Sequence, residues 1–126
     1  MSAHRALLAA FLLSASPTLA QEQAPHRAWE RSIAPPALQD EIRPRVIAAA
    51  TARFADPACR RIAVADSSFN GWSGPPLPGT VSPGRPWEET WIVDLCGRIV
   101  DVLVQLSPGA EGVAVAIPAQ STHLRP

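Results

Sequence analysis

The stretch WEETWIVDLCGRIVDVLVQL, residues 87–106, alternates large apolar and polar side chains on both sides of a Cys-Gly pair. Alternation with a period of two is typical of strands that bury one face, and a glycine-containing pair between two such runs is typical of a tight hairpin. A slip of one residue would scatter the apolar side chains over both faces. We therefore expect strands over 87–95 and 98–106 that share one apolar face, with these cross-strand partners: Leu95 and Arg98, Val93 and Val100, Trp91 and Val102, Glu89 and Val104, Trp87 and Leu106.

An amphipathic helix is predicted upstream of this hairpin, over residues 38–54. Val46, Ile47, Ala50 and Phe54 recur at helical spacing. Pro44 suits the first turn of a helix, where its missing N–H would have no partner anyway, so residues 38–42 are either a preceding turn or a kinked first part. We expect the four apolar residues to cover the apolar face of the hairpin.

Two shorter strands are predicted on either side of the hairpin, over residues 61–65 and 113–117, because β-branched residues and alternation recur there between turn-forming segments. The order of helix and strands predicts a single α+β domain. In this domain one helix packs on a small antiparallel sheet of about four strands.

The chain has two cysteines, Cys59 and Cys96. A redox pair and a metal site are the alternatives to a disulfide, but the C-x-x-C spacing is missing and only His26 and His123, both near the ends, could add ligands. We expect a disulfide, which joins the start of one strand to the end of another and makes them antiparallel. Counting inward from this bridge, we expect Ile62 opposite Val93 and Val64 opposite Trp91.

The first twenty residues resemble a secretory signal peptide, because an apolar run follows His4 and Arg5 and small residues lead to Ala20. We expect a signal peptide over 1–20, a flexible segment over 21–36, the domain over 37–118 and a C-terminal tail over 119–126. No later apolar run has the length of a membrane span. The predicted location is the periplasm or the exterior.

The segment Trp91–Gly97 carries a W-x-V-x-x-C-G pattern, with Cys59 upstream. In this it resembles a group of small exported bacterial envelope proteins. The resemblance implies export and a disulfide, and it implies no activity and no catalytic residue.

The net charge is zero, with eleven basic residues against eleven acidic ones, which speaks against nucleic acid or an anionic membrane as the main partner. We find no phosphate-binding loop, dinucleotide fingerprint or zinc-protease motif, and expect neither cofactor nor metal. Continuing the count from the bridge places Asp66 opposite Glu89, an acid pair that could perform general acid–base hydrolysis. The simpler interpretation is that both are strand-end charges, with Glu89 bending to solvent or pairing with Arg85.

Residues 66–86 have neither helical nor strand periodicity and are rich in Gly, Pro and Ser. Loops of this length are usually functional or disordered. Trp72 lies in the middle of it, so Trp72, Phe69 and Asn70 are the candidate binding residues, unless Phe69 and Trp72 fold back as a cap over the core. The preferred function is a non-enzymatic binding module for an envelope protein or a small ligand. The alternative is a small periplasmic hydrolase that uses Asp66 and Glu89.

Overall fold

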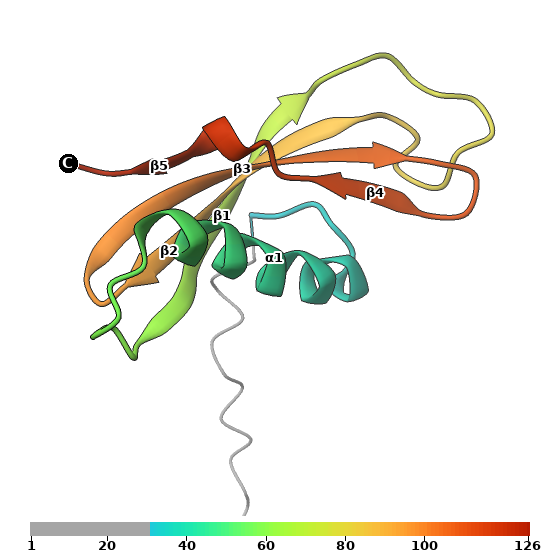
Figure 1. Ribbon diagram of the computed structural model, residues 1–126. Helices are drawn as coiled ribbons and strands as arrows, with labels where there is room; N and C mark the ends of the chain where they lie inside the picture. Colours follow the sequence, from blue (N-terminus) through green and yellow to red (C-terminus); the bar gives the residue numbers. More distant parts are fainter. Residues whose placement is uncertain (1–30) are drawn as a thin grey trace, which may run out of the picture.

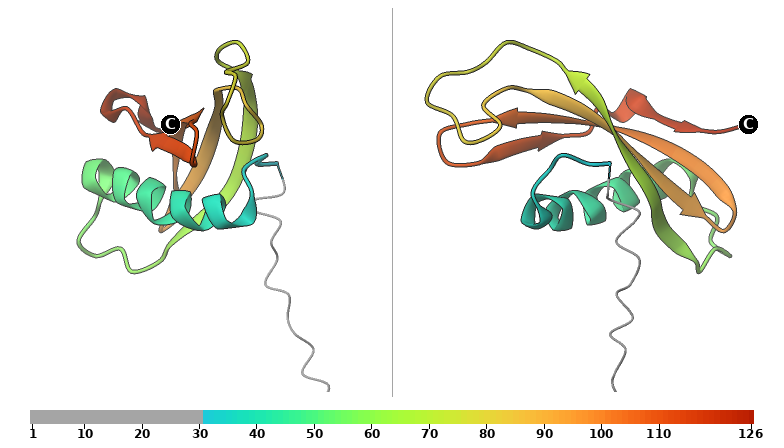
Figure 2. Two further views of the ribbon diagram at one scale, coloured as in Figure 1. Left: turned by 90° about the vertical axis from the view of Figure 1, so that its right-hand side faces the viewer. Right: turned by 180° about the vertical axis from the view of Figure 1, so that it is seen from behind.

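The computed structural model describes residues 31–126, in which one helix lies across one face of a twisted antiparallel sheet (Figures 1 and 2). The elements in chain order are α1 (Pro36–Phe54), β1 (Ile62–Trp72), β2 (Trp87–Leu95), β3 (Arg98–Pro108), β4 (Val113–Ala116), the short helix η2 (Ala119–Ser121) and β5 (Thr122–Leu124). The predicted α+β class is confirmed, with five strands in the sheet. The expected signal peptide over 1–20 and the segment 21–30 lie outside the described residues.

The central hairpin of β2 and β3 has the predicted register, from Leu95 opposite Arg98 to Trp87 opposite Leu106. Its turn consists of Cys96 and Gly97, whose φ angles are 52° and 89°. Two consecutive residues with positive φ make the mirror-image turn whose twist matches that of the flanking strands. Buried and half-buried residues alternate without a break along β2, so the period of two does set the face that each side chain occupies.

The predicted disulfide is present and joins Cys59 to Cys96 with a Cα–Cα distance of 5.8 Å. It ties the chain just before β1 to the turn of the hairpin. A shallow pocket of about 230 Å³ opens beside it, between the end of α1 and the hairpin turn.

The predicted register of β1 is wrong by two residues, because Ile62 pairs with Leu95 and Val64 with Val93. The Cys96 N–H bonds to the Arg61 carbonyl, so the pairing begins directly beside the bridge rather than two residues further in. β1 also extends to Trp72, into the predicted loop, and two irregularities, between Val64 and Asp66 and between Phe69 and Gly71, shift its register. Each extra residue reverses which face the following side chains occupy.

The helix buries Leu38, Ile42, Val46 and Ala50, one residue per turn, against the sheet. Phe54 and Ile47 pack against this core while remaining half-buried. Pro44 lies inside the helix and not in its first turn, which Pro36 occupies. The N–H that Pro44 lacks would bond to the carbonyl of residue 40 on the solvent side, where water can take its place.

The region expected as a C-terminal tail contains β5, which pairs with β3 beyond the end of β4. β4 and β5 thus share one edge of β3, interrupted by η2 (Figure 1). Arg125 adds an ion pair of 2.7 Å to Asp101, and its hydrogen bonds with that carboxylate raise the pKa of the guanidinium. Within residues 31–126, no helix combines the length and the apolar character needed to cross a membrane.

Candidate functional site

A buried carboxylate, that of Glu89, lies on the helix-facing side of β2 and is 0% exposed. Trp87 and Trp91 stand two residues before and after it on the same face, and both indole N–H groups donate to it, at 3.0 Å and 2.9 Å. Period two alone brings these three side chains together. Buried indole N–H groups need an acceptor, and Glu89 supplies one for each.

The other donors to Glu89 come from the chain just before α1. The Ser32 hydroxyl donates to both carboxylate oxygens, at 2.8 Å and 3.0 Å, and the Ile33 N–H donates at 3.0 Å. The Arg31 carbonyl also accepts from the Phe69 N–H of β1 at 3.1 Å. The carboxylate therefore fastens the segment that leads into the helix onto the sheet. With all its partners being donors from the protein itself, Glu89 serves as a structural anchor.

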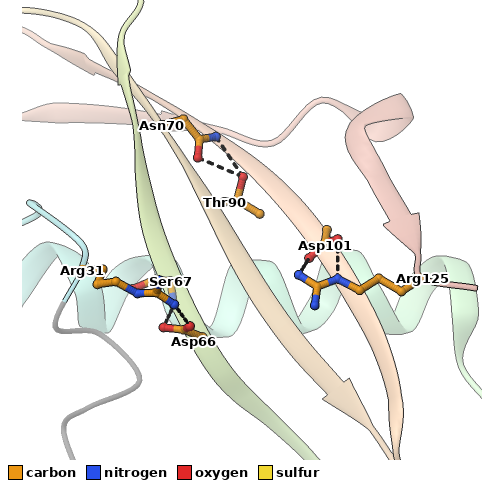
Figure 3. Close-up of polar contacts among 7 residues, drawn as sticks. All are labelled: Arg31, Asp66, Ser67, Asn70, Thr90, Asp101 and Arg125. Atoms are coloured by element: carbon orange, nitrogen blue, oxygen red, sulfur yellow. Dashed lines mark hydrogen bonds and ion pairs between the residues drawn. The ribbon is translucent and has the colours of Figure 1, made fainter.

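The predicted acid pair does not form. Asp66 lies opposite Ile92 rather than Glu89, and Phe69 takes the place opposite Glu89. Asp66 makes an ion pair with Arg31, which Figure 3 shows. Pockets of about 230, 340 and 450 Å³ open on the described surface, and neither acid lines them. The hydrolase hypothesis thus loses the geometry on which it depended.

Trp72, the last residue of β1, remains 43% exposed. Its ring lies edge-on to Phe69 with centroids 5.2 Å apart, and the guanidinium carbon of Arg85 lies 5.0 Å from its centroid. Phe69 packs against the core from its place in β1, opposite Glu89, and not as part of a loop that folds back. Trp72 keeps nearly half of its surface in water.

Asn70, the third candidate binding residue, is separated from the other two. Its amide nitrogen donates to the Thr90 hydroxyl at 2.8 Å, on the sheet face away from α1 (Figure 3). Successive residues of a strand point to opposite faces, so Asn70 points away from Phe69. The irregularity between Phe69 and Gly71 adds one residue and returns Trp72 to the face of Phe69. The surface centred on Trp72 therefore consists of Trp72, Phe69 and Arg85.

Residues 31–126 bring together no group of three or more His, Cys, Asp or Glu side chains that could hold a metal ion. All buried side-chain nitrogen and oxygen atoms of this part of the chain have hydrogen-bond partners. The interior of the described domain thus contains no unsatisfied polar side-chain atom.

Sequence reasoning missed Ser32 and the burial of Glu89. The signal for Glu89 was present, since the hairpin register placed it opposite Val104 on the apolar face, between two tryptophans. An acid on the inner face with an indole at each side is already a candidate for a buried acceptor. Ser32 gave no such signal, because it lies 57 residues away in sequence.

Comparisons with protein-family models, with curated proteins and with solved structures find no match for this chain.

Proposed function

We propose that this chain is an exported, non-enzymatic binding module whose contact surface is centred on Trp72. The observation that carries the proposal is the exposure of Trp72, at 43%, although it belongs to a strand and adjoins Phe69, which packs against the core. Tryptophan is enriched where proteins bind partners, because a rigid ring offers a large contact area at small entropic cost.

The cellular location follows from the disulfide, which suggests an oxidising environment outside the cytoplasm. The W-x-V-x-x-C-G resemblance to small bacterial envelope proteins supports the same assignment. An envelope protein is thus the kind of partner that we propose.

Replacing Trp72 with Ala tests the proposal. We expect the free energy of unfolding to change by less than about 1 kcal/mol, because the ring is half in water, while capture of envelope proteins by the immobilised chain weakens. Leu124→Ala is the matched control, since Leu124 is 37% exposed at the opposite end of the sheet. A loss of about 2 kcal/mol or more with capture intact would assign Trp72 to the core instead.

A further inference from the structure

The loop between β1 and β2 presents four consecutive apolar residues to solvent. Pro75, Pro76, Leu77 and Pro78 are all exposed, with Leu77 at 38%. Proline restricts the residue before it to extended conformations, and three of these four positions are prolines. The segment is thus biased to the extended, three-fold conformation that Pro-rich recognition motifs use.

Backbone hydrogen bonds hold this loop in place. The Leu77 N–H bonds to the Gly84 carbonyl at 2.6 Å, and the Val81 N–H bonds to the Gly109 carbonyl at 2.8 Å, in the turn between β3 and β4. Gly74 packs so closely that a Cβ there would lie 2.7 Å from the Pro86 ring. The loop is ordered before any partner arrives, which lowers the entropic cost of binding.

The charge of the loop is one-sided. Residues 73–86 contain no Asp or Glu, and Arg85 is their sole charged residue. Its Nε donates to the Gly74 carbonyl at 3.1 Å, while its two terminal nitrogens make no hydrogen bond or ion pair within residues 31–126. A guanidinium fixed at Nε and stacked on Trp72 presents a fork that matches a carboxylate.

We propose that residues 75–78 dock into an aromatic-lined groove of a partner protein, with an acidic residue at the rim of that groove bound by Arg85. Extended proline-rich segments are recognised in this way, by aromatic side chains that pack against the proline rings. The inference rests on the proposed binding function and names its partner class. A glycan fits less well, because residues 75–78 carry no polar side chain for sugar hydroxyls and three of them lack an N–H.

The test begins with a photo-crosslinking benzoylphenylalanine in place of Leu77, in the full chain exported by its own host. The same residue in place of the exposed Ala48 of α1 is the control. We expect Leu77, and not Ala48, to crosslink to one protein, at a site that mass spectrometry maps to a segment with Trp or Tyr beside Asp or Glu. Crosslinks to glycan, to lipid or to a second copy, or none above the control, would overturn the proposal.

Binding to the purified partner then tests the residues. We expect the double variant Pro75→Ala/Pro78→Ala to raise the Kd about tenfold, because it loses the contacts of two proline rings. We expect Arg85→Lys to raise the Kd by about the same factor, because lysine lacks the paired guanidinium donors. The matched controls Pro57→Ala and Arg60→Ala change the same residue types at exposed positions at the disulfide end. Thermal melting of each variant checks folding.

Leu77→Ser keeps the prolines and the backbone, and we expect it to weaken binding as well. It takes the place of the double variant if that variant fails to fold. Unchanged affinity in the Leu77 and Arg85 variants would refute the docking of residues 75–78 into a groove. If Trp72→Ala still abolished capture in that case, the contact surface centred on Trp72 would stand and only the groove proposal would fail.

Discussion

Trp72 and Trp87 are direct partners across β1 and β2, yet they have opposite environments. Trp87 is 0% exposed and donates to Glu89, whereas Trp72 is 43% exposed beside Arg85. β2 is flanked by strands on both sides, so Trp87 also has Leu106 of β3 as a partner. β1 is an edge strand, and Trp72 lies at its end. Position in the sheet, and not residue type, thus separates the buried indole of Trp87 from the exposed indole of Trp72.

The largest effect should come from removing each ring in turn. Trp87→Ala creates a large cavity and removes one donor to Glu89, so we expect a loss of about 4–5 kcal/mol. Trp72→Ala should cost less than about 1 kcal/mol. Chemical denaturation of the two purified variants measures both values. Equal losses in the free energy of unfolding would show that Trp72 contributes to the core as much as Trp87 does.

The next test concerns the carboxylate that distinguishes the two environments. Glu89→Ala leaves two buried indole N–H groups and the part-buried Ile33 N–H without their acceptor, which we expect to cost about 4 kcal/mol. Glu88→Ala is the control, since this neighbour is half-buried on the other face and, within residues 31–126, its carboxylate accepts a hydrogen bond only from the Gln105 amide, at 3.4 Å. We expect its cost to stay within about 0.5 kcal/mol. A large loss for Glu88 as well would mean that any acid on β2 matters.

Removing the disulfide tests whether the end of the sheet that carries Trp72 and Trp87 is independent of the opposite end. Cys59→Ser/Cys96→Ser opens a loop with a sequence separation of 37 residues, so we expect a loss of between about 3 and 4 kcal/mol. Trp72 and Trp87 lie far along the strands from the bridge, and their indole N–H resonances should keep their positions in the folded variant. In the wild-type chain recovered from an oxidising compartment, two reactive thiols after denaturation without reductant would contradict the bridge.

The smallest effect isolates the indole N–H itself. Trp87→Phe keeps an aromatic ring but removes a donor to the buried carboxylate, so we expect a loss of about 2 kcal/mol. Trp72→Phe removes an N–H that the solvent can satisfy, and its effect should fall below about 0.5 kcal/mol. Thermal melts of the two variants, recorded side by side, give the difference. If the two values matched, hydrogen bonding to Glu89 would not explain why one tryptophan is structural.

Much of the fold could be predicted from local sequence patterns. Alternation placed each residue of β2 and β3 on its correct face, including Glu89, and Cys96-Gly97 indicated the turn between them. Asp66 lies opposite Ile92, three positions from the predicted Glu89: two come from the start of the pairing directly beside the bridge and one from the irregularity between Val64 and Asp66, and no local pattern in the sequence indicates either. Of the buried residues of α1, Val46 and Ala50 were predicted and Leu38 and Ile42 were not. Pro44 suggested a start of the helix later than the observed one at Pro36.

The α+β class, the pairing of the two cysteines and the apolar face of the hairpin follow from the sequence, because each depends on spacing along the chain. The burial of Glu89 and the exposure of Trp72 follow only from the folded chain. Ser32 and Ile33, distant in sequence, supply donors that make burial of a carboxylate tolerable, and within residues 31–126 no strand lies beyond β1 to cover Trp72. Desolvation is a property of the assembled surroundings, so the local pattern could assign a side chain to a face but not to water or to the core.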